Sequence, residues 1–347
     1  MTREVIRALA RDCGFELAGV TAAEPAADAA WYQEWVDAGY AGEMSYLTGR
    51  RADLRNDPRA LLPTARSIIC VGKLYHAPWP HSIELNDHER AWISRYAWGD
   101  DYHSVVRRGL MRLDTMLRER AGPFDSKICV DTAPLLERSY ARQAGLGWIG
   151  RNTCLINQPR GSWFFLGELL VSLAIEPDMP PPDRCGTCRR CIDACPTEAI
   201  VPAGANRYAI DSRLCISYFT IELRGPIDES QRAGIGPHVF GCDICQDVCP
   251  WNRRSPVTSE PAFAARHFAP PLEKLAGITE GEFRVMFRGT PVTRTRYSGF
   301  LRNVAVAMAN SGLARFRGPL EKLAASSDAV VAEHARWGLA RLGDRSS

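Results

Sequence analysis

The chain has 347 residues, enough for about two or three domains with a sizeable hydrophobic core. Its 46% hydrophobic and 24% charged residues are typical of a globular protein and exclude a disordered chain, and a net charge of +3 is too small to indicate a partner. The charged N-terminus lacks the apolar segment of a signal peptide, and the most apolar run, 163–175, is too short and too charged to span a bilayer. We therefore expect a soluble, cytoplasmic protein with no membrane partner.

Helical and strand patterns alternate over the first 176 residues. An amphipathic helix opens the chain, and the hydrophobic periodicity predicts further helices over 27–38, 105–120 and 135–143. Strands are expected over 15–20, 67–75, 127–130, 153–156 and 163–171. Strands 67–75 and 163–171 are almost continuously apolar, which is typical of strands buried on both faces. The fold class predicted for this part is α/β or α+β.

Asp131 stands at the carboxyl end of the predicted strand 127–130. Thr132 can cap the next helix, with Pro134 in its first turn. Ligands bind at the carboxyl ends of strands in open α/β sheets, so Asp131 is a candidate for chemistry. Helix capping explains the same position equally well.

Gly145, Gly147 and Gly150 have the spacing of a dinucleotide-binding fingerprint, but a helix precedes them and a strand follows, the reverse of the order that the fingerprint needs. We interpret them as a helix C-cap with a tight connection, or as a backbone surface for a large flat ligand. The histidines of the 76–88 loop have no metal-site spacing and are interpreted as surface or loop residues. Cys13, Cys70, Cys129 and Cys154 lie in apolar settings and are interpreted as small buried hydrophobes.

A Pro-rich connector, 176–183, leads into a segment that holds eight of the twelve cysteines. One run has three cysteines two residues apart followed by x3-Cys-Pro, and a second run reads Cys-x2-Cys-x3-Cys-Pro. In two-cluster bacterial ferredoxins such a run holds one [4Fe–4S] cluster, while the Cys before Pro ligates the other. The spacing predicts a first cluster bound by Cys185, Cys188, Cys191 and Cys249 and a second bound by Cys195, Cys215, Cys242 and Cys245.

Zinc sites and disulfides are the alternatives for these cysteines. Zinc prefers two CxxC pairs separated by a spacer, which is not this pattern. Cysteines spaced so tightly, in a chain without a secretory leader, belong to a reducing compartment rather than to a disulfide framework. Cys215 must reach in from outside the runs, a departure from the plain ferredoxin repeat that a simple electron carrier does not need.

The C-terminal part, 256–347, is predicted to be helical over 301–309, 313–325 and 330–342, and the segment 327–342 resembles one unit of a HEAT-type repeat. Residues 283–320 contain no Asp or Glu. They contain seven arginines: Arg284, Arg288, Arg294, Arg296, Arg302, Arg315 and Arg317. Such a patch favours a polyanion partner, with a solvated helix face as the alternative.

These segments, in this order, resemble the epoxyqueuosine reductase family, cobalamin-dependent iron–sulfur enzymes of the last step of queuosine synthesis in tRNA. The segments that carry the resemblance are Arg55 with 57–58 and 61–63, then 94–103, 130–138, 145–152, Cys215 with 216–218, 241–250 and the helical tail. The resemblance implies a corrinoid-binding catalytic domain over 1–176, a ferredoxin-like domain over 177–255 and a HEAT-like, tRNA-binding domain over 256–347.

The family reduces the epoxide of a modified guanosine at the wobble position of a tRNA anticodon, with loss of water. The resemblance implies that the clusters pass single electrons to cobalamin, fed by an external donor such as a flavodoxin or ferredoxin, in a monomer. Asp131 would be the general acid for the departing epoxide oxygen. That role is expected to need a pKa raised toward neutral by burial beside the corrin ring.

Matching positions imply cobalamin contacts at Arg55, Ser94, Asp131, Leu155, Leu166 and Ser217, with Asp243 beside the second cluster. The sequence lacks Asp-x-His-x-x-Gly, because Val106 stands where the Gly is required after Asp101 and His103, so no protein His ligand to cobalt is expected. The tRNA is expected to contact Arg138, Arg142 and Arg151 near the pocket and Arg294, Arg296 and Arg302 in the basic tail.

Three other functions agree with parts of the sequence. Reductive dehalogenases share the corrinoid and the two clusters, but they usually carry a twin-arginine leader and a catalytic Tyr. An electron-transfer module does not explain the long α/β segment before the clusters. A zinc-stabilised nucleic-acid-binding scaffold explains the arginines but not the cysteine spacing.

Overall fold

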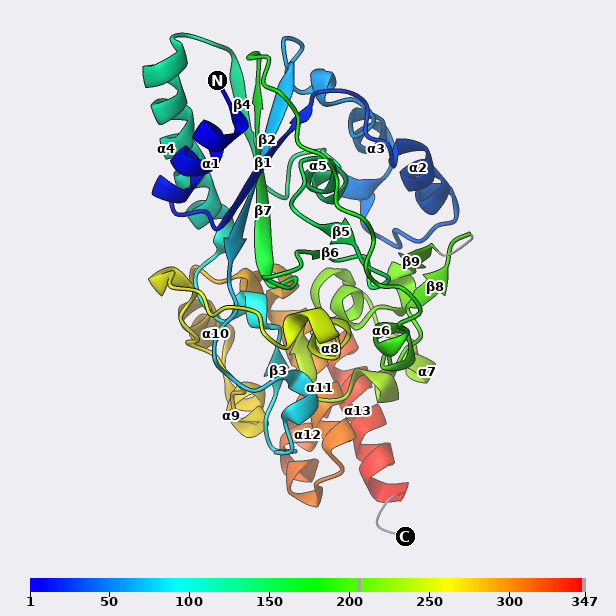
Figure 1. Ribbon diagram of the computed structural model, residues 1–347. Helices are drawn as coiled ribbons and strands as arrows, with labels where there is room; N and C mark the ends of the chain where they lie inside the picture. The colour runs from blue at the N-terminus through cyan, green and yellow to red at the C-terminus, as the bar shows by residue number, and fades with distance from the viewer. Residues whose placement is uncertain (205–206, 345–347) are drawn as a thin grey trace.

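A four-stranded sheet forms the centre of the N-terminal part of the computed structural model, which describes residues 1–204 and 207–344 (Figure 1). The strands lie in the order β1 (Leu17–Ala22), β2 (Ser67–Leu74), β7 (Phe164–Val171) and β4 (Ser126–Cys129). Every residue of β2 is buried, as its continuous apolar run predicts. All four strands were expected from the sequence within a few residues of their bounds.

Helices cover both faces of this sheet (Figure 1). Successive residues of a strand point to opposite faces, so Ile69 and Val71 pack with α1 (Arg3–Asp12) and α4 (Tyr102–Ala121), while Ile68 packs on the side of α5 (Glu137–Gln143). The remaining N-terminal elements are α2 (Ala29–Asp37), α3 (Arg50–Leu54), β3 (Trp92–Ile93), β5 (Trp148–Ile149) and β6 (Leu155–Ile156).

Each neighbouring pair in the sheet is antiparallel, so the fold is mixed α/β but not an open parallel sheet. The argument that placed Asp131 at a ligand-binding strand end came from open parallel sheets and does not apply here. Asp131 still follows β4, and the last residue of that strand, Cys129, pairs with Glu168 of β7. The glycine motif is a tight connection, as expected: Gly145 has a φ of +78°, and a Cβ on Gly147 would lie 2.2 Å from the Ile156 carbonyl oxygen.

Short elements carry the eight cysteines of the middle segment. They are α6 (Arg190–Asp193), β8 (Ile200–Pro202), β9 (Tyr208–Ile210), the π-helix Tyr218–Glu222, α7 (Glu229–Arg232), β10 (His238–Phe240) and α8 (Ile244–Asp247). Loops connect these elements, so local hydrogen bonds alone do not hold the cysteines in place.

The C-terminal helices pack on one hydrophobic core. They are α9 (Leu272–Gly277), α10 (Glu280–Met286), α11 (Arg296–Ser311), α12 (Arg317–Ala324) and α13 (Ala329–Asp344). Trp92 and Trp98, which precede the cysteines by about 90 residues in sequence, lie in the same core, and β3 pairs in parallel with β10. Among the described residues, every helix is too short or too polar to cross a bilayer.

Arg302 of α11 lies in the interior of the protein, with 0% of its surface exposed. Its guanidinium donates hydrogen bonds to the carbonyl oxygens of Phe219, Leu223 (2.9 Å) and Gly225 (2.6 Å), which surround the end of the π-helix. The expectation that Arg302 contacts tRNA is therefore wrong, because every donor faces the protein. The side chain instead joins α11 to the cysteine-bearing segment.

Replacing Arg302 by Met should destabilise the fold strongly. The buried carbonyl oxygen of Phe219 and the partly buried carbonyl oxygens of Leu223 and Gly225 would lose their donor, and an unsatisfied buried group costs about 1–3 kcal/mol, so we expect a loss of roughly 3 kcal/mol. Urea denaturation, followed by tryptophan fluorescence, measures the free energy of unfolding. Arg317→Met, an exposed change of the same type on α12, is the control. Equal stability of the two variants would contradict the structural role of Arg302.

Candidate functional site

The four cysteines of the first predicted set line one surface cavity of about 320 Å³. Cys185 and Cys188 come from the loop before α6, Cys191 lies in α6, and Cys249 comes from the loop after α8. Their thiols surround a cavity, which fits a cluster of several atoms better than a single metal ion. No group of three or more His, Cys, Asp or Glu side chains within the described ranges is placed to hold a single metal ion.

The second predicted set lies deeper in the protein. Burial, and then the nearby Cys215 and Cys195 thiols, raise the pKa of Cys242. Cys215 and Cys242 pack against the hydrophobic cluster that includes Phe219. The structure thus brings together the same four residues that the spacing grouped, although they come from three separate stretches of chain.

Cys154 stands beside this second set. Its thiol shares a hydrogen bond with the thiol of Cys245, which lowers the pKa of Cys154. The sequence interpretation of Cys154 as an isolated buried hydrophobe is therefore wrong, since it is partly exposed and contacts a predicted cluster ligand. No spacing rule could show this, because the two residues are about 90 positions apart.

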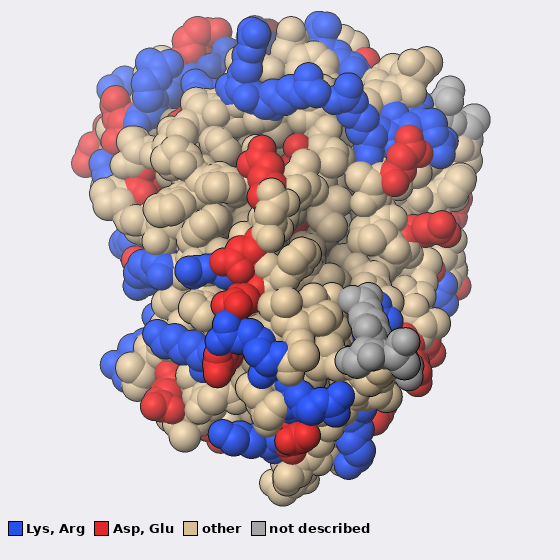
Figure 2. All heavy atoms as spheres, turned by 90° about the horizontal axis from the view of Figure 1, so that it is seen from below, with Lys and Arg blue, Asp and Glu red and all other residues tan. Residues whose placement is uncertain are grey.

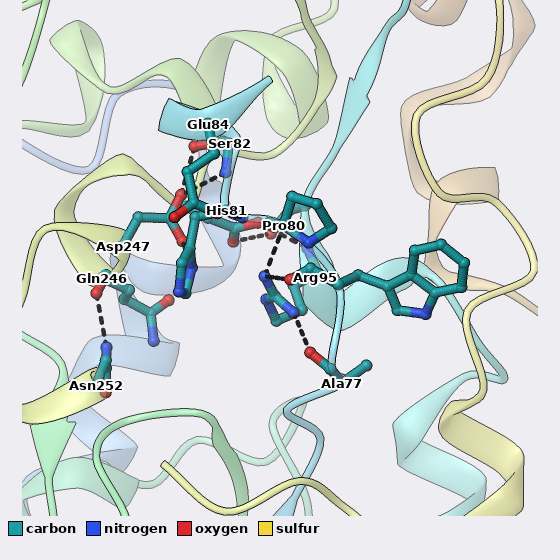
Figure 3. Close-up of polar contacts among 12 residues, drawn as sticks. Ala77, Pro80, His81, Ser82, Glu84, Arg95, Gln246, Asp247 and Asn252 are labelled. Atoms are coloured by element: carbon teal, nitrogen blue, oxygen red, sulfur yellow. Dashed lines mark hydrogen bonds and ion pairs between the residues drawn. The ribbon is translucent and has the colours of Figure 1, made fainter. Parts of the chain in front are cut away.

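Asp247 ties the cysteine loop to the N-terminal part of the chain. Its buried carboxylate accepts hydrogen bonds from the Ser82 backbone N–H (2.9 Å), the Ser82 hydroxyl (2.5 Å) and His81 Nδ1 (2.7 Å). Figure 3 shows His81 and Ser82 directed at this carboxylate. The hydrogen bond to Asp247 raises the pKa of His81. His81 is thus a structural partner of the cysteine loop and not only a surface residue.

Asp243 makes a second connection between the cysteine loop and the N-terminal part of the chain. Its carboxylate accepts hydrogen bonds from Trp92 Nε1 (3.0 Å), the Ser94 hydroxyl (2.6 Å) and the Arg95 backbone N–H (2.8 Å). Burial, and then repulsion from Asp247, raise the pKa of Asp243 to about 6. Two of the predicted cobalamin contacts, Ser94 and Asp243, therefore lie together, with their polar side-chain atoms hydrogen-bonded to each other.

Asp131 lies at the end of a chain of acidic and basic groups. Its Oδ2 is 3.0 Å from His103 Nε2, and His103 Nδ1 is 2.7 Å from Asp101 Oδ1. Arg294 stands 3.9 Å from the same Asp131 oxygen and 2.8 Å from Glu222. The Asp131 carboxyl is 40% exposed and its backbone is in the left-handed region, with a φ of +49°. A strained, accessible carboxylate of this kind is typical of a functional position.

Within the Asp101–His103–Asp131 group, the proton is held by His103 rather than by Asp131. Burial opposes the charge on His103, but the hydrogen bonds and charges of Asp101 and Asp131 outweigh it and raise the His103 pKa to about 9. Burial likewise favours neutral Asp131, but His103 and Arg294 hold the pKa of Asp131 below its ordinary value. The expected upward shift of the Asp131 pKa is therefore wrong, because the hydrogen bond and charge of His103, together with Arg294 and Tyr102, outweigh the effect of burial.

A pair of buried carboxyl groups supports Asp131 from the other side. Glu137 Oε1 accepts the Asp131 backbone N–H at 2.5 Å. Glu168 of β7 is fully buried, and neither of its oxygens receives a hydrogen bond from another donor. Burial, and then the charge of Asp131, raise the pKa of Glu137 to about 7, and burial, and then the charge of Glu137, raise the pKa of Glu168 well above its ordinary value. Such a pair is stable only when it shares a proton.

A cleft of about 740 Å³ opens beside Asp131. It contains five of the residues expected at a ligand or tRNA site: Arg55, Asp131, Arg138, Arg142 and Arg151. Trp31, Tyr32 and Trp148 add aromatic walls, so the cleft suits a large flat ligand with a polar edge. Arg55 is 5% exposed and donates to the carbonyl oxygens of Tyr46 and Arg51.

The other expected cobalamin contacts do not line this cleft. Leu155 and Leu166 belong to the hydrophobic cluster on the α5 side of the sheet. Ser217 precedes the π-helix, where its backbone and hydroxyl lie against the Cys215 thiol. These three positions remain predictions.

Acidic residues from elsewhere in the chain pair with several arginines of the segment 283–320. Arg315 pairs with Glu89 (2.6 Å) and Glu273 (2.7 Å). Arg294 pairs with Glu222 beside Asp131, so it belongs to the candidate active site rather than to a distant phosphate surface. Figure 2, which shows the molecule from below, has acidic side chains set among the basic ones. Arg288, Arg296 and Arg317 are exposed and have no ion pair among the described residues.

The sequence interpretation missed His103, Glu137 and Glu222. Glu168 gave a usable signal, because an acid inside an apolar strand must find a partner. Asp101 and His103 at the start of a helix gave a weaker one, since capping explains the pattern equally well.

Comparison with known proteins places the chain in a family. Residues 55–132 match the family model "Epoxyqueuosine reductase QueG, DUF1730", and residues 184–252 match "4Fe-4S double cluster binding domain". A relative from Xanthomonas campestris pv. campestris, named epoxyqueuosine reductase, is 41% identical over 346 residues, which cover 97% of this chain and 95% of the relative. This chain belongs to the epoxyqueuosine reductase family. The first matched segment holds Arg55, Ser94, His103 and Asp131, and the second holds all eight predicted cluster ligands.

Other epoxyqueuosine reductases are similar to this chain over nearly its whole length. One from Pseudomonas aeruginosa is 39% identical over 341 residues, 96% of this chain and 92% of its own. A crystal structure of an epoxyqueuosine reductase with an epoxyqueuosine-modified tRNA stem loop superposes with a TM-score of 0.88 at 28% identity. The superposition covers 98% of this chain and 90% of the other, so the whole mixed α/β fold is shared.

In this member of the epoxyqueuosine reductase family, His103 should titrate near pH 9. Between about pH 6.5 and 9 the folded protein holds a proton that the unfolded chain has lost, so the stability from this group is complete below pH 6.5 and is lost as pH rises through 9. Nitrogen NMR of the imidazole measures the pKa of His103. Asp131→Asn should lower the His103 pKa, whereas Asp12→Asn, at the end of α1, should not. An unchanged pKa in Asp131→Asn would contradict the pairing.

Proposed function

We propose that this chain reduces epoxyqueuosine to queuosine at the wobble position of a tRNA anticodon. The observation that carries the proposal is the Asp131–His103 pair, which stands at a cleft large enough for a flipped-out base in a chain that also holds two four-cysteine sets. Chemistry on a base requires the base to leave the stack, and the aromatic walls of the cleft can receive it. The full-length similarity to epoxyqueuosine reductases supports the same activity.

The residues beside Asp131 supply protons. Conversion of an epoxide to an alkene with loss of water needs two electrons and two protons. Asp131 donates to the departing oxygen, and His103 Nε2–H, 3.0 Å from Asp131 Oδ2, returns a proton to that carboxylate. Because Asp131 is ionised at rest, it acts as a relay for the His103 proton. Arg294 holds the carboxylate in place from the side of Glu222.

The electrons would come through the two cysteine sets from an external carrier, such as a flavodoxin or ferredoxin. Cobalamin, when bound, would supply the strongly reducing centre that the epoxide requires. Arg55 and Asp131, which line the cleft, would hold it. The contacts expected at Ser94, Leu155, Leu166, Ser217 and Asp243 are part of this proposal, although these residues do not line the cleft. The aromatic walls and polar edge of the cleft fit a corrin ring.

The tRNA would lie across the cleft. Arg138, Arg142 and Arg151 line it and can contact the anticodon loop, and the exposed Arg296 can reach a phosphate. We interpret α11 to α13 as a HEAT-like extension, since α13 packs against both α11 and α12. The three predicted domains, a monomer and a cytoplasmic location are part of this proposal.

Asp131→Asn tests the proposal directly. An amide cannot relay the His103 proton, so turnover of epoxyqueuosine-containing tRNA should fall by about 10²-fold or more. Iron content and tRNA affinity should stay at their wild-type values, because Asp131 contacts neither cysteine set. Asp12→Asn is the control. A near-normal rate for Asp131→Asn, with the clusters loaded, would reject Asp131 as the proton donor.

Changing Arg288 and Arg296 together to Ala should weaken tRNA binding. Each lost phosphate contact should lower the slope of log affinity against log salt by roughly one. Arg315→Ala is the matched control, since its guanidinium is already paired with Glu89 and Glu273. If the double variant keeps both the affinity and the salt slope, the tRNA lies on another surface.

A further inference from the structure

The first cysteine set differs from the second in its surroundings. Cys185, Cys188 and Cys191 are partly exposed in a cavity that opens on the surface. The cysteines of the second set are also partly exposed, but Cys215 and Cys242 pack against a hydrophobic cluster, whereas all four cysteines of the first set line this cavity. The cavity gives an external electron carrier an approach to the first set. Electron transfer weakens steeply with distance, so we infer that electrons enter at the first set.

The rim of this cavity is basic. Arg151, Arg184 and Arg190 line it, and of the described residues that line it none is acidic. Arg184 and Arg190 are exposed and have no ion pair within the described part of the chain. Arginines next in sequence to residues of the cavity lining are exposed too: Arg189, Arg253 and Arg254. Of these, Arg189 is paired with Asp193 at 3.4 Å.

The lining of the same cavity is also partly apolar, because Ile156, Pro250 and Trp251 belong to it. An apolar centre with a charged rim is the usual composition of a protein–protein interface, and short-lived redox encounters bury less than about 1,200 Å². The cavity and its rim are compatible with such a small patch.

We propose that Arg151, Arg184 and Arg190 form the docking rim for an acidic one-electron carrier protein. The carrier gives one electron to the oxidised cluster held by the first set, and no bond is formed or broken. The proposal rests on the cluster ligation in the proposed function but not on the epoxide chemistry. An RNA partner is less suited to the rim, because phosphate contacts extend along a strand, whereas these three arginines surround one redox site.

The test uses the reconstituted holoenzyme without tRNA, with reduced flavodoxin as the probe. Anaerobic stopped-flow absorbance gives the second-order rate constant for cluster reduction over a series of salt concentrations. In the Arg184→Glu/Arg190→Glu variant this constant should fall by about tenfold or more at low salt, and its salt dependence should flatten, because electrostatic steering raises association rates by roughly 10- to 10³-fold. Binding of oxidised flavodoxin should weaken in parallel.

Three controls make the result specific. Reduction by dithionite, which needs no docked protein, should keep its wild-type rate, and iron content should be unchanged. Arg11→Glu/Arg120→Glu makes the same charge change on α1 and α4, away from the cysteines, and should behave as wild type (Figure 1). If charge reversal lowers the iron content, Arg184→Gln/Arg190→Gln is measured in the same way.

An unchanged rate constant with flavodoxin would overturn the proposal. A loss of tRNA affinity with a normal rate of cluster reduction would also overturn it and assign the rim to RNA. Failure of the epoxide reaction in the wild type would refute the proposed function and leave this measurement intact, since no tRNA takes part in it.

Discussion

The structure depends on two buried carboxylates, Asp243 and Asp247, that stand in the same loop as the second run of cysteines. A buried charge without partners costs several kcal/mol, so each carboxylate must find donors, and each finds them in the segment 81–95. Those hydrogen bonds hold the loops of Cys242, Cys245 and Cys249 against β3. The same segment enters the core of the C-terminal helices through Trp92 and Trp98, so all three parts of the chain meet there.

Local sequence patterns predicted much of this fold. The strands at 67–75 and 163–171 were recognisable because burial on both faces leaves a continuous apolar run, and the two cysteine sets followed from ligand spacing. The antiparallel order of the sheet was not predictable, since pairing direction depends on connections between distant segments. The burial of Arg302 and the contact of Cys154 with Cys245 were hidden for the same reason, because each joins residues about 80 or 90 positions apart.

The arginine-rich segment 283–320 shows how a pattern of charge in sequence can mislead. A stretch without Asp or Glu suggests a positive surface, but partners need not be neighbours in sequence. Glu89 and Glu273 reach Arg315, and Glu222 reaches Arg294. By contrast, Arg184 and Arg190 gave no signal in the sequence, because they are isolated basic residues next to cysteines, and Arg151 was expected at the tRNA site instead. Only the structure shows that they face the same cavity.

The low pKa of Asp131 changes how the proton-donor role proposed for it must be understood. A carboxyl group that is ionised at rest cannot store the proton that it delivers, so a second group must hold it. His103 is protonated up to about pH 9, and its Nε2 already touches Asp131 Oδ2. On the other side, Glu137, which shares a proton with Glu168, accepts the Asp131 backbone N–H and positions this residue. In the proposed reaction, the low pKa of Asp131 lets it take up a proton from His103 only when a more basic oxygen is present to receive it.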